Sequence, residues 1–309
     1  MENSNQTQVT EFILVGLSRD RRTQLFLFVL FLLMYVITVF GNTALIGTVI
    51  ASPNIHTPMY YFLCHLSFLD LFYSLSIIPK MLLDMVSVEG GRISVIGCMI
   101  QMCTCLFLGQ TECILLAVMA YDRYIAICFP LRYTVIMSWK LCKNITVIIW
   151  VGSFLQTNLP IISQPPNFCH EKHINHFVCE ILAVLSLACG NIYLFEKMIF
   201  FGSLFTLLAP FAFIFVTYIC IIIAILKIQS VDGRTKAFST CASHLTVVCM
   251  FYGTSMTMYL GPMKNASEKH KYVTIIYGTI TPMLNPLIYS LRNNEVKKAF
   301  TKIFPHSNV

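Results

Sequence analysis

Seven long, mostly apolar stretches occupy most of this 309-residue sequence. A helix needs about 20 consecutive apolar residues to cross the hydrocarbon core of a bilayer, and each stretch is about that long or longer. We therefore expect an all-α membrane protein in which seven transmembrane helices form one bundle. The expected helices are Leu25–Ile50, Pro58–Val86, Val95–Cys128, Leu141–Pro160, Met198–Lys227, Phe238–Leu260 and Val273–Leu291.

The low charge content argues against several other classes of protein. Only 11% of the residues are charged, whereas a soluble globular domain carries about 25%. A soluble enzyme, a disordered chain and a nucleic-acid-binding module are therefore poor interpretations. The net charge of +7 sits on the few polar segments, where it suits an anionic membrane surface.

Seven helices and their short connections leave no room for a separate soluble domain. We expect a single seven-helix domain over residues 1–309, with an outer tail at 1–23, a bundle at 24–291 and an inner tail at 292–309. The apolar run Phe12–Leu17 is too short for the core of a secretory signal peptide. The first helix is therefore expected to act as an uncleaved insertion signal.

The orientation of the bundle rests on glycosylation sequons rather than on charge. Lys and Arg divide almost equally between the two sides, so the positive-inside rule does not decide. Sequons at Asn5 and Asn265 fall on the same side of a seven-helix bundle, and glycosylation requires a lumenal site. Both favour an outer N-terminus and a cytoplasmic C-terminus, although a third match at Asn144 would lie inside.

The third stretch closes with Asp122-Arg123-Tyr124. Charged residues near the membrane are costly and usually functional. An Asp–Arg pair at a helix end can form a local ion pair, and it can also release Arg123 toward the bundle or toward a partner. The simpler interpretation is an ordinary charged boundary.

The seventh stretch contains Asn285-Pro286. Proline donates no backbone hydrogen bond, and its ring crowds the preceding turn. The carbonyl that it frees needs another donor, which we expect to be Asn285 or water. A kinked, hydrated helix of this kind can hold two packings, although a purely structural kink is common.

These motifs, in this order, resemble those of a class A G-protein-coupled receptor. The residues within and around them resemble the signature blocks of the olfactory receptors in particular. Tyr121 and the short N-terminal tail are more similar to the tetrapod-type (class II) branch. The resemblance extends from residue 41 to residue 293. The blocks that carry it are Gly41-Asn42, Pro58–Leu63, Leu66–Asp70, Met119–Cys128, Lys236–Leu245 and Pro282–Asn293.

The resemblance implies a receptor that binds small, mostly apolar odorants in the outer half of the bundle. It also implies coupling to a heterotrimeric G protein of the stimulatory olfactory type, which raises cyclic AMP, and a multi-pass location in the plasma membrane. The residues expected to serve this coupling and its switch are Asp122, Arg123, Tyr124, Tyr218, His244, Asn285, Pro286 and Tyr289.

Two acids, Asp70 and Glu112, lie deep in apolar helices. A charged, unpaired acid at the bilayer centre costs about 2.5–3.5 kcal/mol on insertion scales, so each needs a partner, a proton or a cation. The resemblance implies that Asp70 joins Asn42 and Asn285 in an interior polar network near Glu112, with sodium as the candidate ion. No other cofactor is expected.

Four cysteines lie on the outer side, where oxidation is possible: Cys98, Cys169, Cys179 and Cys189. Four cysteines allow three connectivities. The resemblance implies Cys98–Cys179 and Cys169–Cys189, with Cys98–Cys189 as the alternative.

The segment that contains these cysteines is also rich in histidine. Imidazole and carboxylate groups at this density can hold zinc or copper, but cysteines in a disulfide are no longer ligands. His176 with Glu180 is the residual candidate for a metal site, and we expect no metal.

The resemblance implies an odorant pocket framed by the third, fifth and sixth helices, and residue spacing shows which small and polar residues on each of these helices share a face. Residues that differ by three, four or seven share a helix face. Packing between helices is the simpler explanation of such positions. The expected pocket residues are Met102, Cys105, Leu106, Gly109, Gln110, Cys113, Gly202, Ser203, Thr206, Tyr252, Ser255 and Tyr259.

In residues 294–304, apolar residues at helical spacing fall on one face and lysines fall on the other, which predicts a short amphipathic helix on the inner leaflet.

Two other functions stay open: a class A receptor for an endogenous metabolite outside the nose, and a seven-helix transporter. Ser243-His244 lacks a third group to orient the histidine, so an enzyme is not expected.

Overall fold

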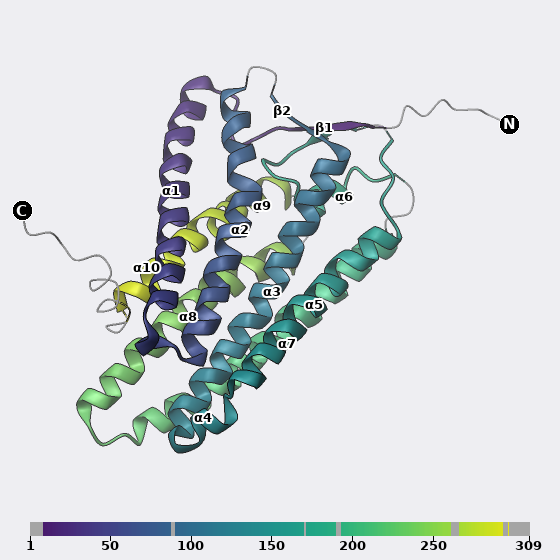
Figure 1. The fold of residues 1–309 in the computed structure, drawn as a ribbon. Helices are drawn as coiled ribbons and strands as arrows, with labels where there is room; N and C mark the ends of the chain where they lie inside the picture. The colour runs from purple at the N-terminus through teal and green to yellow at the C-terminus, as the bar shows by residue number, and fades with distance from the viewer. Residues whose placement is uncertain are drawn as a thin grey trace, which may run out of the picture.

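The computed structural model describes residues 9–87, 90–169, 171–189, 193–260 and 266–292, together with residue 296. Its long helices pack lengthwise against one another as a bundle (Figure 1). In chain order the elements are β1 (Glu11–Leu14), α1 (Arg21–Ala51), η1 (Pro53–Ile55), α2 (Pro58–Val86), β2 (Gly91–Ser94), α3 (Val95–Cys128), η2 (Pro130–Arg132), α4 (Tyr133–Ile136), α5 (Trp139–Ser163), β3 (His173–Ile174), α6 (Ile181–Leu185), α7 (Tyr193–Leu226), α8 (Val231–Tyr259), α9 (Ala266–Ile275), the π-helical η3 (Ile276–Ile280) and α10 (Thr281–Arg292).

All seven predicted helices have a counterpart. The helices α2 and α3 begin and end at the predicted residues. The first helix begins four residues before the predicted start, because the Asp20 carboxylate accepts a hydrogen bond from Thr23 N at 2.9 Å and caps it. Ser138 and Ser230 cap α5 and α8 in the same way, which extends both beyond their apolar stretches.

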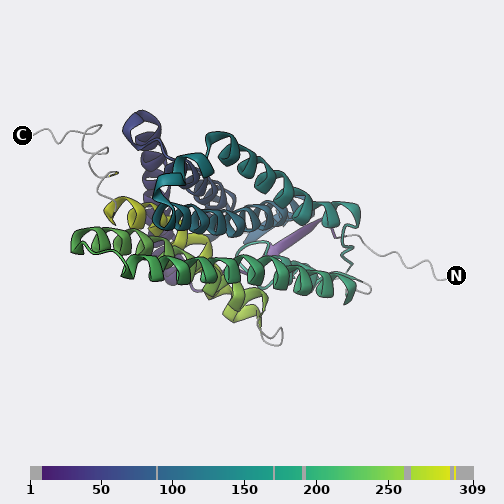
Figure 2. The ribbon, with the colours of Figure 1, turned by 90° about the horizontal axis from the view of Figure 1, so that it is seen from below.

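The sixth and seventh predicted helices differ in character from the others. Within the described residues, five helices are long and apolar enough to cross a membrane, namely α1, α2, α3, α5 and residues 197–226 of α7. The first turns of α8 are polar, with Asp232, Arg234 and Lys236, yet α8 runs alongside α7 (Figure 2). The seventh passage is composite: α9, η3 and α10 follow one another without a break. The described residues therefore fit a seven-helix bundle.

Large apolar side chains cover the surface of the helices, and several polar side chains are buried between the helices beside the apolar core. Phe26, Phe40 and Phe205 are each about 70% exposed. Asn42 and Thr111, by contrast, are completely buried. Only hydrocarbon solvates an exposed phenylalanine shell well, so this arrangement is the signature of a bundle that lies in a bilayer.

A small sheet that the sequence patterns did not predict closes one end of the bundle (Figure 1). The central strand β1 pairs antiparallel with β2 and parallel with β3. Phe12 is completely buried, and its ring meets the Phe168 ring edge to face at 5.0 Å between centroids. The predicted N-terminal tail thus contains a strand that belongs to the folded cap of the bundle.

Three predictions fall on residues outside the described ranges. These are the sequons at Asn5 and Asn265 and the amphipathic segment at 294–304, of which only Val296 is described, and it is buried. All three remain predictions.

Candidate functional site

A cavity of about 280 Å³ lies beneath the sheet-bearing end of the bundle. It is lined by residues of α2, α3, α5, α6, α7, α8, α9 and η3 and by the segment that precedes α6. All but one of the predicted pocket residues line it. They are Met102, Cys105, Leu106, Gly109, Gln110, Cys113, Gly202, Ser203, Thr206, Ser255 and Tyr259.

Tyr252 is the exception, and its prediction as a pocket residue is corrected. It is completely buried, and its hydroxyl donates to the Cys113 carbonyl at 2.8 Å and lies 3.2 Å from the Cys113 thiol. The Tyr252 hydroxyl is thus bonded to α3, and Tyr252 does not line the cavity. Its neighbour Phe251 occupies the wall instead.

The sequence patterns missed other parts of the wall, among them residues of α2 and of the seventh passage. Tyr73 and Ile77 contribute from α2, and Thr274 and Tyr277 contribute from the seventh passage. Tyr73 and Tyr277 contact each other with ring centroids 5.0 Å apart. The spacing of Tyr73 and Ile77, four residues apart on one face of α2, was a usable signal.

Gly109 matters because of the space that it leaves. A Cβ atom at this position would collide with the Tyr277 hydroxyl. The absence of a side chain therefore lets α3 approach η3, and it places a phenol hydroxyl beside the cavity.

Two disulfides secure the segment between α5 and α7, called the cover below, which contributes Pro166, Val178, Cys179 and Glu180 to the cavity wall. Cys98 at the start of α3 pairs with Cys179, and Cys169 pairs with Cys189, which is the connectivity that the resemblance implies. The alternative Cys98–Cys189 bridge is not formed. Because Cys179 lines the cavity, the first disulfide ties the cover directly to α3.

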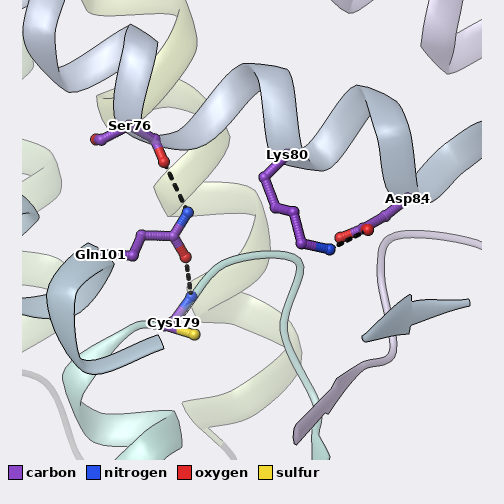
Figure 3. A network of polar contacts seen from close by, with 5 residues as sticks. All are labelled: Ser76, Lys80, Asp84, Gln101 and Cys179. Carbon is purple, nitrogen blue, oxygen red and sulfur yellow. Dashed lines mark hydrogen bonds and ion pairs between the residues drawn. The ribbon is translucent and has the colours of Figure 1, made fainter. Parts of the chain in front are cut away.

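Gln101 provides a second, noncovalent anchor for the cover (Figure 3). Its side-chain amide donates to the Ser76 carbonyl at 2.7 Å, and its carbonyl accepts from the Cys179 backbone N–H at 3.0 Å. One buried side chain thus connects α2, α3 and the cover. Lys80 and Asp84 form an ion pair one turn further along α2.

Glu180 follows Cys179 and also lines the cavity. Its Oε2 accepts from the backbone N–H groups of Leu182 and Ala183 at 2.9 and 3.0 Å, which caps α6. Its Oε1 is buried and accepts no hydrogen bond from any described residue. Burial, opposed only in part by these backbone donors, raises the pKa of Glu180 to about 7.

His176 packs on the other side of the same segment. Its Nδ1 accepts from Val178 N at 3.2 Å, and its Nε2 lies 3.4 Å from the Thr274 hydroxyl. Burial lowers the pKa of His176 to about 3, assisted by Lys271 nearby, so the ring is neutral. Both ring nitrogens therefore have protein partners, which leaves no free nitrogen lone pair for the metal-site alternative with Glu180.

The opposite end of α3 holds Asp122 and Arg123, but they form no ion pair among the described residues. Asp122 is buried and accepts a hydrogen bond from the Tyr133 hydroxyl of α4 at 2.8 Å. The local Asp122–Arg123 ion pair, which the sequence allowed, is therefore not formed. Arg123 lies within electrostatic range of Tyr218, His244 and Tyr289, on α7, α8 and α10.

Tyr218 and His244 join α7 to α8 beside Arg123. The Tyr218 hydroxyl and His244 Nδ1 are 2.8 Å apart, and their rings stack with centroids 5.8 Å apart. His244 Nε2 is buried and has no partner among the described residues. Four of the predicted coupling residues therefore gather where α3, α7, α8 and α10 meet, namely Arg123, Tyr218, His244 and Tyr289.

Comparison with known proteins gives the family directly. The olfactory receptor family profile matches residues 31–307. The chain belongs to the olfactory receptor family. It is 46% identical to olfactory receptor 2A7 of Mus musculus over 302 residues, 97% of each chain. It is 45% identical to olfactory receptor 2A12 of Homo sapiens over 97% of each chain, and 46% identical to olfactory receptor 13D1 of Homo sapiens over 98% of this chain and 88% of that one. Members of the olfactory receptor family are receptors, not enzymes.

In this olfactory receptor family member, buried hydrogen bonds join the helices at the cavity and elsewhere in the bundle. The Tyr252–Cys113 contact joins α8 to α3 at the cavity wall, which Cys113 lines. Deeper, the Asn285 amide donates to both oxygens of Asp70, at 3.1 and 3.0 Å. These hydrogen bonds lie at interfaces between helices. A change in helix packing would therefore have to break or rearrange them.

The carbonyl that Pro286 frees has a different donor from the one expected. Pro282 O accepts from the Asn42 amide of α1 at 3.0 Å, whereas Asn285 is engaged with Asp70. The correction follows from close packing, because a Cβ at Gly41 would lie 3.1 Å from the Pro286 ring. Asn42 therefore joins the interior network through the backbone of α10 rather than through Asp70.

Proposed function

We propose that this olfactory receptor binds small, mostly apolar odorants in the cavity and activates a heterotrimeric G protein of the stimulatory olfactory type, which raises cyclic AMP. The observation that carries the proposal is the shared helix α3. It supplies the cavity wall from Met102 to Cys113 and presents Arg123 at its other end. A ligand in the cavity and a protein at the inner end therefore act on the same rigid element.

The mechanism is a shift between two packings of the helices. A ligand that binds one packing better than the other changes their populations by its difference in affinity. The cavity is lined by α3, α7 and α8, and the same three helices enclose Arg123. A ligand that changes their spacing at the outer end thus alters the surface that the G protein meets.

A sodium ion beside Asp70 is part of this proposal. Sodium prefers oxygen donors, and the region offers unpaired oxygens rather than nitrogens. Oxygens of Glu112, Asn285 and Ser74 are buried without a hydrogen-bond partner among the described residues. The carboxylates of Asp70 and Glu112 lie within electrostatic range of each other, so a cation would relieve their repulsion.

We place the sheet-bearing end outside the plasma membrane and the Arg123 end in the cytoplasm. The two disulfides near the sheet support this orientation, because disulfides persist in an oxidising compartment. The N-terminus is then extracellular and the C-terminus cytoplasmic. Apart from the odorant and the G protein, the bilayer is the partner that the exposed apolar shell requires.

The test is an odorant panel screened with a cyclic AMP reporter, followed by dose–response curves for Tyr259→Phe and Gln110→Leu at matched surface expression. Each change removes a hydrogen-bonding group from the cavity wall. Losing one such bond costs about 0.5–1.5 kcal/mol, which lowers potency by up to roughly tenfold. Tyr272→Phe is the control, because Tyr272 is 69% exposed and lies outside the cavity.

The outcome also separates the alternatives. If neither variant changes potency or efficacy for any agonist, the odorant does not occupy this cavity. Substrate flux without a cyclic AMP response would favour the transporter, and a response confined to a metabolite would favour a receptor for an endogenous ligand.

A further inference from the structure

The cavity has one charge-bearing side chain at its wall. Its lining among the described residues consists of apolar, amide, hydroxyl and thiol groups, with Glu180 as the sole carboxylate and no Lys, Arg or His. A carboxylate odorant would therefore find no cation to pair with and would face a like charge. A wall with one carboxylate and no cationic side chain therefore favours cationic ligands over anionic ones.

Glu180 is held in place rather than mobile. The preceding Cys179 is bonded covalently to α3 and is also bound by Gln101. One carboxylate oxygen, Oε2, is fixed by two backbone N–H groups. The other, Oε1, is left without a donor, although the residue is only 8% exposed. Glu180 Oε1 is therefore a fixed hydrogen-bond acceptor that a donor group on a ligand could satisfy.

The surroundings of Glu180 suit a donor group attached to an apolar body. Tyr259 and Cys105 lie within electrostatic range of the carboxylate and also line the cavity. Both are neutral groups that can share hydrogen bonds with a ligand headgroup. Beyond them the wall is formed by side chains such as Ile77, Leu106 and Leu207, which suit a hydrocarbon.

We propose that Glu180 selects ligands that carry a primary amine on an apolar body, with the ammonium group bound at Oε1. This inference rests on the proposed odorant function and names the ligand class of the same cavity. Charge-assisted hydrogen bonds are roughly twice as strong as neutral ones, so an amine gains more from this acceptor than an alcohol does. The raised pKa of Glu180 supports the argument, because a bound cation would offset the desolvation of the carboxylate.

The experiment uses three probes with the same six-carbon chain: hexan-1-amine, hexan-1-ol and hexanoic acid. Binding is measured as the ligand-dependent rise in the unfolding temperature of the purified full-length receptor, which requires no G protein. Signalling is measured separately with the cyclic AMP reporter. Binding without signalling would refute the proposed function and leave this inference intact.

Glu180→Gln is the decisive variant, because glutamine keeps an oxygen for the α6 N–H groups and removes the charge. Glu171→Gln is the matched control, since it removes one negative charge from the same outer segment at a side chain that is 62% exposed. We expect the amine to bind the parent receptor more tightly than the alcohol, and the acid to bind most weakly. We expect Glu180→Gln to weaken amine binding about tenfold or more, with the alcohol and the Glu171→Gln control changed by less than about threefold.

Two results would overturn the inference. One is an amine that binds the parent receptor no better than the acid. The other is amine binding that Glu180→Gln leaves unchanged while the variant retains the unfolding temperature of the parent. If Glu180→Gln fails to fold, the order of the three probes on the parent receptor and on Glu171→Gln still decides.

Discussion

Replacing Gln101 with leucine should loosen the cover of the cavity without changing the size of the side chain greatly. The parent glutamine makes two hydrogen bonds, of 2.7 Å to Ser76 O and 3.0 Å from Cys179 N (Figure 3). A typical intramolecular hydrogen bond contributes about 0.5–1.5 kcal/mol, so the pair contributes about 1–3 kcal/mol. The Cys179 N–H is buried, and leucine leaves it without its acceptor, which favours the upper half of that range.

Two measurements check this prediction on purified Gln101→Leu receptor. The free energy of unfolding should fall by about 1–3 kcal/mol, and odorant potency should fall as well, because Cys179 and Glu180 line the cavity. Gln164→Leu is the control, since Gln164 is an exposed glutamine just after α5. Unchanged unfolding and unchanged potency in Gln101→Leu would refute the anchoring role of this side chain.

Two further predictions concern the two ends of α3. Arg123→Ala should abolish the cyclic AMP response at normal surface expression, because Arg123 is the basic group among the helices α7, α8 and α10, and a full response would contradict its coupling role. Cys98→Ser should cost about 2–5 kcal/mol, the usual loss for a native disulfide, and should retain the receptor inside the cell. Mass mapping that finds Cys98 as a free thiol in the parent receptor would contradict the second prediction.

Local patterns predicted the helices well because hydrophobic length is a property of consecutive residues. The bounds of α2 and α3 follow directly from it. Helix ends that depend on a cap, such as Asp20 before α1, extend beyond the apolar stretch and were placed late by hydropathy alone. The strand β1 was missed because four residues gain stability only by pairing with β2 and β3, which are distant in the sequence.

Spacing along one helix identifies residues that share a face, and Cys113 and Ser255, selected in this way, both line the cavity. Residue spacing does not determine whether a tyrosine on that face contacts the cavity or a neighbouring helix. Tyr252 hydrogen-bonds Cys113, and this contact depends on the distance between α3 and α8.

The sequence by itself determined the class of protein, the number of expected helices and the family, because these depend on composition, on apolar length and on motifs of adjacent residues. Only the tertiary structure decided which groups meet. It assigned the Pro282 carbonyl to Asn42, released Asp122 to Tyr133 and left one oxygen of Glu180 without a donor at the cavity wall. Each outcome depends on the relative position of helices far apart in the chain, and hydrogen bonds require atoms within about 3 Å of one another, a condition that no local pattern encodes.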